Sequence, residues 1–431
     1  MSCNDRAFDF EFVLIDLYPL HSAAGTLTQP LYLYDVHVRD SMITGGGWGT
    51  TGACGDYRSS FVNIHMSSFI TCINNGGKLS GGMYIKDGHV KATSSTFNKA
   101  FGSIGGAMLS EENQNSEFTD CVFEDNEATC CGGVIDDGGT ANTTFTNCIF
   151  RNNKANEGAL YYGFAGGGTR FINSVSYGSE ALSNGGLFFF SSRSRGYIDN
   201  FTGYDITAAG DGGVYRHASA ASFPTLINSR FENIFATKCS AGFTQDGVIQ
   251  LQNVSYKNMT SVMYGGLCLS YSAANAVKDI VLDGVVAAAN GALTVKLDDQ
   301  DIVMSNITIK NGDATLGGGI YVMDANNKRK CLKLTNAKIE TSKSDKGTIY
   351  LDDACIEMTS STVIGNKATR GSLTYFAGSN AKATYSDVSF TNNQAKKETT
   401  GKASLCGGAA DARGGFYFEV TQKINLFLIP A

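Results

Sequence analysis

The side chains of this sequence that could do acid–base chemistry include three pairs of adjacent aspartates. The pairs are Asp136-Asp137, Asp298-Asp299 and Asp352-Asp353. Enzymes that cleave polysaccharides hold two carboxyl groups at a defined separation, and calcium sites also gather carboxylates. Each pair follows a run of strand-forming residues, in VIDDGG, KLDDQD and YLDDAC. Because aspartate is favoured in turns, we interpret the pairs as turn residues, with a catalytic pair as the alternative.

Other groups that could take part in chemistry are scattered along the chain. The histidines are His21, His37, His65, His89 and His217. The sequence shows no Ser-His-Asp or Cys-His arrangement, no Cys-x-x-Cys pair and no phosphate-binding glycine loop. We therefore predict no catalytic residues, no cofactor and no metal site, and we expect that the chain is not an enzyme.

A sequence repeat runs along the chain and determines where these side chains lie in the fold. The stretch FTDCVFEDNEA at residues 118–128 returns as FTNCIFRNNKA at residues 145–155. Glycines followed by apolar residues recur from Gly82 to Gly371 in steps of 24 to 29 residues. Aligning the repeats on an aromatic position gives the column Phe97, Phe123, Phe150, Phe231, Tyr256 and Phe390. The side chains at this position stay similar in size, which indicates a packing constraint. The column therefore predicts repeats that are stacked on one another.

The residues between the glycines predict strands. They form short runs rich in Phe, Val, Ile, Thr and Tyr, bounded by Gly, Asn, Asp and Ser. The 51 glycines are too dense for helices, since each interior glycine costs a helix about 1 kcal/mol relative to alanine. We predict an all-β fold, a single right-handed parallel β-helix with coils of about 24–29 residues. Recurrent Asn at one corner, as at Asn126 and Asn153, predicts an amide ladder.

The extent of the repeat predicts how the chain is divided. We expect N-terminal β coils of unclear register over residues 1–60 and β-helix repeats over residues 61–400. Residues 401–431 are expected to form a C-terminal β segment, either an end coil or an assembly segment. Each coil contacts only its neighbours, so the repeats predict one elongated domain.

The repeat resembles that of a known family. The run Cys121-Val-Phe123-Glu-Asp-Asn126-Glu-Ala128, followed by Gly132-Gly133-Val-Ile135, carries the resemblance. It is similar to the GGA[ILV] and FxxN repeats of chlamydial polymorphic outer-membrane proteins and of large surface proteins of protists. The resemblance covers roughly residues 60–395. It implies a β-helix that is displayed at a cell surface.

Composition narrows the expected partners and location. The net charge of −6 disfavours nucleic acid and anionic membranes, and no apolar run is long enough to predict a transmembrane helix. We expect an extracellular or cell-surface protein. Its first residues lack the basic start and apolar core of a signal peptide, which leaves another export route or an incomplete N-terminus open. Five sequons are candidate glycosylation sites, at Asn142, Asn200, Asn253, Asn258 and Asn306.

Two cysteines share one column of the repeat. Cys121 and Cys148 lie one coil apart, two places before the aromatic column. One possibility is a disulfide between them. The other is a pair of small inward side chains, which we favour because Ser and Val occupy the same column in other repeats.

The strand after each glycine is apolar at two successive positions. Because successive side chains face opposite ways, this predicts a sheet covered on both faces, by the chain's own loops or by another molecule. Phe188, Phe189 and Phe190 are the candidate lateral contacts. We predict a non-enzymatic structural protein, a filament subunit or adhesin that associates with itself or with related β-helix chains. The alternatives are a polysaccharide-active β-helix enzyme, either a lyase or a glycoside hydrolase, and a saccharide-binding module with glycans as partners.

Overall fold

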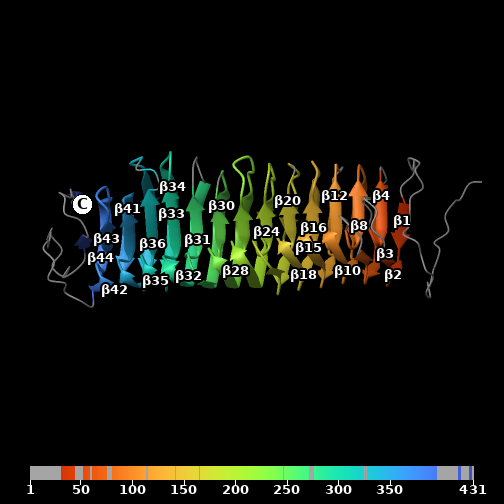
Figure 1. The fold of residues 1–431 in the computed structure, drawn as a ribbon, viewed down its shortest axis with the longest axis horizontal. Coiled ribbons are helices and arrows are strands. Elements are labelled where there is room, and N and C mark those ends of the chain that lie inside the picture. Colours follow the sequence, from red (N-terminus) through yellow and green to blue (C-terminus); the bar gives the residue numbers. More distant parts are fainter. Residues whose placement is uncertain are drawn as a thin grey trace, which may run out of the picture.

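The chain folds into a rod of stacked coils. The computed structural model describes residues 31–395, 416–418 and 427–429, apart from short gaps at 44–51, 59–60, 75–79, 113–114, 141, 165, 246, 271–275, 325 and 327. Figure 1 shows the early coils at one end of the rod and the late coils at the other. The paired strands are parallel, and the described residues contain no helix. The predicted all-β parallel β-helix is confirmed.

A fourteen-stranded sheet, here called sheet 1, runs along one side of the rod (Figure 1). Its strands are β4 (Gly55–Arg58), β8 (Met83–Lys86), β12 (Met108–Glu111), β16 (Ile135–Asp137), β20 (Tyr161–Gly163), β24 (Phe188–Phe190), β27 (Tyr215–His217), β29 (Gly242–Thr244), β31 (Leu267–Ser270), β33 (Leu293–Leu297), β36 (Ile320–Asp324), β40 (Ile349–Asp352), β43 (Thr374–Ala377) and β46 (Phe416–Phe418). Each coil contributes one strand, so side chains at equivalent positions form rows along the rod.

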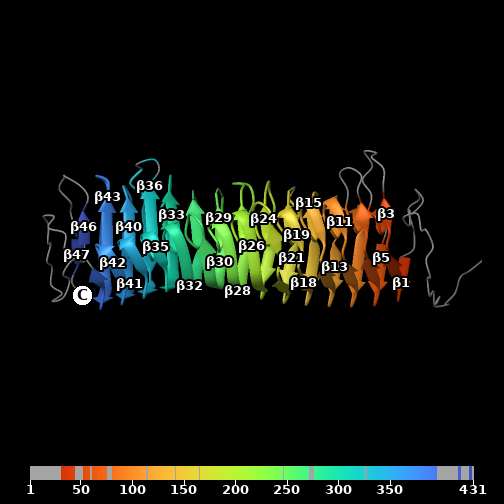
Figure 2. The same ribbon diagram turned by 60° about the horizontal axis from the view of Figure 1, so that its bottom comes forward.

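The other strands form a second sheet that wraps the rest of the rod (Figure 2). One coil supplies β13 (Ser116–Thr119), β14 (Val122–Glu124) and β15 (Glu127–Cys131), which pair with β17 (Thr143–Thr146), β18 (Ile149–Arg151) and β19 (Lys154–Glu157) of the next. Further along, the short strands merge into β26 (Thr202–Asp211), β28 (Thr225–Lys238), β30 (Gln250–Ser261) and β32 (Ala276–Asn290). These long strands pass the corners through residues with positive φ, such as Asn228 and Asn233.

Aromatic rings stack inside the rod as the repeated column predicts. Phe97, Phe123 and Phe150 follow one another with ring centroids 4.8 and 5.4 Å apart. A second column, which includes Phe118 and Phe145, meets the first edge to face. Phe123 and Phe150 are fully buried. Over these coils the core is therefore a ladder of rings, in which each coil packs on the next; further along the rod, Ser176 and Gly203 take the same position.

The expected amide ladder is also present. Nδ2 of Asn126 donates to Oδ1 of Asn153 at 3.0 Å and to the carbonyl oxygen of Phe97 at 3.0 Å. Nδ2 of Asn153 donates to the carbonyl oxygen of Phe123 at 3.0 Å. Both asparagines are fully buried, and these bonds satisfy donors that would otherwise be costly in the interior.

The stacked strands extend beyond residues 61–400 on both sides. β1 (Leu31–Tyr34) pairs with β5 (Phe61–His65), and β46 pairs with β43. β47 (Phe427–Ile429) pairs with β44 (Lys382–Thr391). The N-terminal apolar run FDFEFVLIDLYPL lies outside the described residues.

Candidate active site

The outer face of sheet 1 carries one row of side chains in register from strand to strand, here called the outer row. Over β8, β12, β16 and β20 it consists of Tyr84, Leu109, Asp136 and Tyr162. The residues before them face inward, because side chains alternate along a strand. Tyr84 and Leu109 are buried even without a partner molecule. The chain itself therefore covers much of this face.

Asp136 and Asp137 are strand residues, which corrects their interpretation as a turn. Both belong to β16, with exposed fractions of 5% and 1%. Asp136 lies on the outer face and Asp137 points into the rod. Asp137 is in register with Ser110 on one side and Gly163 on the other. Because these neighbours are small, the interior has room for a carboxyl group at this height.

Glu111 lies beside Asp136 on the outer face. It follows Ser110, the partner of Asp137, so it stands diagonally across from Asp136. A Cβ placed on Gly138 would lie 3.7 Å from Cγ of Glu111 and 3.8 Å from Oδ1 of Asp136. The Glu111 side chain and a carboxyl oxygen of Asp136 thus border the same glycine. The Tyr84 hydroxyl donates to Oε2 of Glu111 at 2.6 Å and fixes its orientation.

The two outer carboxyl groups have different surroundings. Burial, reinforced by the nearby charges of Asp137 and Glu111, raises the pKa of Asp136 well above its usual 3.8. Glu111 is only half-buried. On the other side of Asp136, burial together with Glu157 and Asp136 raises the pKa of Tyr162 to about 12. The raised pKa favours the protonated form of Asp136, which stands beside the more accessible carboxyl group of Glu111. Two carboxyl groups in such different surroundings can take separate acid and base roles.

Asp137 belongs to a polar group inside the rod. The hydroxyl of Thr169 donates to its Oδ2 at 3.0 Å, while Oδ1 has no hydrogen-bond partner. Burial raises the pKa of Asp137 to about 7, although the Thr169 bond and the Gly139 backbone N–H oppose the shift. Nearby, Tyr161 and Ser194 share a hydrogen bond of 2.8 Å. Asp137 does not reach the outer face and is a buried acid rather than a substrate contact.

Asp298, Asp299 and Asp353 lie outside strands, as their interpretation as turn residues predicts, whereas Asp352 is the last residue of β40 and corrects it. Asp299 forms an ion pair with Lys328 at 2.9 Å, and Asp298 accepts a bond from the Asn326 side chain. Asp353 has a positive φ of 48° and accepts the N–H of Asn380 at 2.9 Å. Asp352 accepts the hydroxyl proton of Tyr321 at 3.0 Å. Asp298, Asp299 and Asp353 thus hold loops, and Asp352 accepts from a tyrosine of the preceding strand, as Glu111 does.

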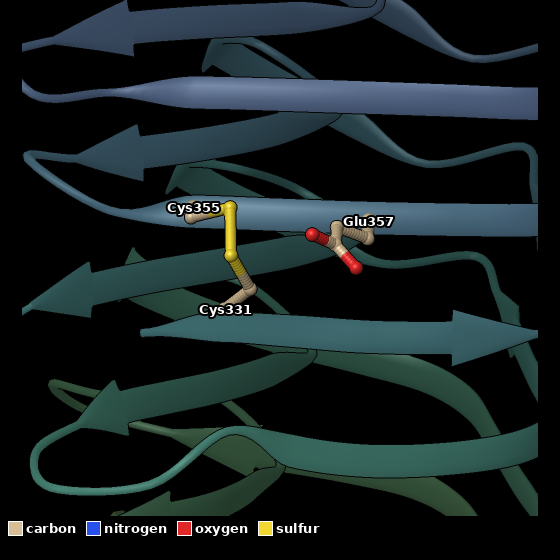
Figure 3. A group of neighbouring side chains, drawn as sticks. All are labelled: Cys331, Cys355 and Glu357. Atoms are coloured by element: carbon tan, nitrogen blue, oxygen red, sulfur yellow. A yellow bond between two sulfur atoms is a disulfide. The ribbon is translucent and has the colours of Figure 1, made fainter. Parts of the chain in front are cut away.

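Two other polar groups within the described residues, His217 and the Cys331–Cys355–Glu357 group, do not form a site. His217 is buried on the inner face of β27, and burial lowers its pKa to about 4. Figure 3 shows Cys331, Cys355 and Glu357 close together, with ligand atoms within 4.8 Å of one another. The two sulfur atoms are joined in a disulfide, so neither is a thiolate that could hold a metal.

Disulfides form between cysteines that the sequence analysis did not pair. Disulfides join Cys54 to Cys72, Cys239 to Cys268 and Cys331 to Cys355, and the adjacent Cys130 and Cys131 are also bonded. Cys121 and Cys148 are instead free and buried, so the disulfide considered for them is wrong and the inward small-residue interpretation is confirmed. Cys239–Cys268 and Cys331–Cys355 join residues 29 and 24 apart, a spacing of one coil that column alignment could have shown, whereas Cys54 and Cys72 are 18 residues apart and lie within one coil.

The predicted lateral contacts are not available for that role. Phe188 and Phe190 point into the core and are 0% and 1% exposed, and Phe189 in the outer row is 7% exposed. The prediction fails because the chain already buries all three rings. The sequon residues Asn142, Asn200, Asn253, Asn258 and Asn306 are all exposed. Their occupancy stays a prediction.

Comparison with known proteins adds two solved structures of similar fold. No family model matches the sequence, and no curated protein matches it. One similar structure is the catalytic unit of a thermostable GH87 α-1,3-glucanase from Streptomyces thermodiastaticus strain HF3-3, at 13% identity and a TM-score of 0.42. It aligns with 79% of this chain, which spans 64% of that structure. The other is the catalytic domain of a GH87 α-1,3-glucanase in complex with nigerose, at 12% identity, a TM-score of 0.36, and coverage of 84% and 64%.

The expectation that the chain is not an enzyme requires correction. Both similar structures are described as catalytic domains. At this identity the likeness concerns the fold alone. The expectation had rested on carboxylates that were thought to lie in separate turns, and the structure instead brings Asp136 and Glu111 to one place. Within the described residues, no helix is long and apolar enough to span a membrane.

Sequence reasoning missed Glu111, Tyr84 and Tyr162. Glycines served to align the coils, but their distance from the strand varies from coil to coil. The strand register pairs Met83 with Met108, which stand one and two residues after the glycines used as marks. A slip of one residue exchanges the two faces of a strand. The buried aromatic column would not have removed the slip, because Phe97 stands 12 residues before Leu109 and Phe123 stands 13 residues before Asp136.

Proposed function

We propose that this β-helix cleaves glycosidic bonds in a polysaccharide at the outer face of sheet 1, with Asp136 and Glu111 as the reacting carboxyl groups. The observation that supports the proposal is the pairing of a carboxyl group whose raised pKa favours the protonated form with a more accessible one on the same face. Glycoside hydrolysis uses such a pair, one as acid and the other as nucleophile or base.

In the proposed reaction, Asp136 donates its proton to the glycosidic oxygen while the bond from the anomeric carbon to that oxygen breaks. Glu111 either attacks the anomeric carbon or removes a proton from the attacking water. Tyr84 holds the Glu111 carboxyl group through the 2.6 Å hydrogen bond. Tyr162, next to Asp136 in the outer row, is positioned to contact the sugar ring. Water supplies the hydroxyl group of the new reducing end, so the step needs no other reactant.

The approach to the site is over the sheet and not through the interior. The void enclosed by Phe188, Phe190, Tyr215, Leu226 and Ile249 is apolar, and no carboxyl group lines it. Glu111, half-buried at the end of β12, is the more accessible of the two carboxyl groups. A substrate would therefore contact Glu111 and the edge of Tyr162 first.

The test is the release of reducing ends from a panel of neutral and acidic polysaccharides. Wild-type protein is expected to cleave at least one, and Asp136→Asn and Glu111→Gln each to lower the rate by about 10²–10⁴-fold, the usual contribution of a positioned acid or base. Asp352→Asn, a change at a carboxylate bonded to Tyr321, is the matched control and should keep the activity. Absence of cleavage by the wild type across the panel would refute the proposal.

A second proposed function is association of the rod with further copies of the chain. An exposed apolar cluster favours it: Phe235, Val262, Met263, Tyr264 and Val286 are 37–53% exposed. Phe235 and Val286 are in register with Thr260 between them, so they lie on one face. Exposed apolar patches mark interaction sites. Sedimentation of wild type and of Val286→Asp at micromolar concentration tests it, and a wild type that runs as a monomer would refute it.

We also propose an extracellular or cell-surface location. The four disulfides support it, because disulfides persist mainly in oxidising compartments. Occupied sequons would support it further. Mass spectrometry of protein from its native source, before and after glycosidase treatment, would show whether any of the five asparagines carries a glycan.

A further inference from the structure

The outer row continues past the two carboxyl groups along the rod. After Tyr162, the register places Phe189 on β24, Arg216 on β27 and Phe243 on β29 at the same height. The rings of Tyr162 and Phe189 stack with centroids 5.1 Å apart. The guanidinium of Arg216 lies 4.3 Å from the centre of the Phe243 ring. The row thus changes from acidic to aromatic within one coil of Asp136.

A second row lies beside the first on the same face. Phe164, Ser191, Ala218 and Gln245 each stand two residues beyond a member of the outer row. Backbone N–H groups of this second row continue the hydrogen bonds between the strands of sheet 1. The N–H of Phe164 donates to the carbonyl oxygen of Asp137 at 3.1 Å, and the N–H of Gln245 donates to the carbonyl oxygen of His217 at 2.9 Å. Phe164 is 51% exposed. Gln245 also accepts a 2.5 Å bond from Arg216, which links the two rows.

We infer that these two rows form a binding strip for a neutral, unbranched polysaccharide lying parallel to the rod axis; this inference rests on the proposed function. Sugar rings have an apolar face, which suits Phe164 and the edges of Tyr162 and Phe243, and a hydroxyl rim, which suits Ser191 and Gln245. From Asp136 to Phe243 the strip spans four strand spacings, about 19 Å. Several sugar units therefore lie on one side of the cleaved bond.

The charges near the strip favour a neutral chain over an acidic one. The charges of Glu111 and Glu157 flank its acidic end. Its one cationic member, Arg216, is half-buried, bonded to Gln245 and placed over the Phe243 ring. A uronic acid polymer would bring carboxylates toward acidic side chains and find only a guanidinium that is already engaged. Hydroxyl groups meet no such repulsion.

Binding can be measured apart from cleavage, using the full chain with Asp136→Asn to prevent turnover. Affinity electrophoresis in gels containing amylose, laminarin or polygalacturonate gives the dissociation constants. Amylose or laminarin is expected to retard the protein. Phe164→Ala and Phe243→Leu should weaken that binding by at least about threefold, in keeping with an aromatic contact. Tyr177→Ala, an equally exposed ring on the second sheet (41%), is the control and should leave it unchanged.

The results separate this inference from the proposed function. Retardation that depends on Phe164 and Phe243 supports the strip, even if wild-type protein cleaves none of the polysaccharides. Cleavage by the wild type with no dependence on either ring would overturn the strip and leave the proposed function standing. Retardation by polygalacturonate alone, or by none of the three polymers, would also overturn it.

Discussion

Asp136-Asp137 and Asp352-Asp353 are the same dipeptide at the end of a strand in the same sheet, yet the molecule uses them differently. In β16 the strand continues through both aspartates, and Asp137 accepts the hydroxyl proton of Thr169 from the next coil. In β40 the chain turns at Asp353, whose φ is 48°, and the neighbouring coil supplies the N–H of Asn380. Both places receive a donor from the next coil, so the difference shows that neither the dipeptide nor a neighbouring donor alone fixes a turn.

A similar contrast holds for buried acids. Asp324 is 8% exposed and accepts backbone N–H groups from Asn326, Lys328 and Arg329 at 3.0–3.3 Å. Asp137 is 1% exposed and has one side-chain donor, Thr169. The oxygens of Asp324 thus receive three backbone donors, whereas Oδ1 of Asp137 has no hydrogen-bond partner. The two buried acids therefore differ in how many of their oxygen lone pairs are satisfied.

The largest expected difference between the two dipeptides is catalytic. Asp136→Asn should lower polysaccharide cleavage by about 10²–10⁴-fold, because it removes the proton donor. Asp352→Asn should change the rate by less than twofold, since that side chain only holds Tyr321 in place. Initial rates of reducing-end release measure both. Equal losses in the two variants would remove the functional distinction drawn here.

Asp137→Asn should stabilise the protein at alkaline pH. The pKa of Asp137 rises from 3.8 to about 7 on folding, so its ionisation destabilises the folded state progressively between pH 4 and pH 7 and fully above that. The shift corresponds to a gain on the order of 4 kcal/mol at pH 9 and little at pH 4. Urea unfolding at both values provides the measurement. A loss of stability at pH 9 would show that the anion is stabilised inside the rod.

His217 occupies the same inward position as Asp137, three strands further along. Its protonation should lower the stability of the protein at acidic pH. Register connects them through Gly163 and Phe190. Burial lowers the pKa of His217 from 6.5 to about 4, so the unfolded chain takes up the proton first and stability falls as pH drops from 6.5 to 4. His217→Gln should remove about 3 kcal/mol of that fall. Urea midpoints between pH 4 and pH 8 test this, and an unchanged acid slope would contradict it.

Asp324→Asn should give a smaller effect of opposite sign to Asp137→Asn. The amide keeps one acceptor oxygen and loses the charge that three loop N–H groups share, a cost of about 1–3 kcal/mol. The stability of Asp324→Asn and Asp137→Asn at pH 9, measured side by side, sharpens the comparison of the two buried acids. Stabilisation by both changes would mean that the loop donors contribute nothing.

The sequence by itself determined the solenoid, its core and its corners. Phe123 and Phe150 repeat at a fixed spacing because stacking requires the same ring at the same height in each coil. Asn126 and Asn153 repeat because a buried amide finds its partner only in the next coil. These constraints recur in successive coils, so they produce a repeating pattern of residues that predicts the fold from the sequence alone.

Only the tertiary structure decided which side chains share the outer face with Asp136. That depends on strand register, and a shift of one residue moves a side chain to the opposite face. The glycine marks vary by a residue or more from coil to coil, so they could not place Glu111 beside Asp136 or Phe189 in the outer row. The same limit misplaced Phe188 and Phe190, which the structure buries inside the rod. The residues of the candidate site do not recur from coil to coil. Pairing between strands of neighbouring coils brings them together.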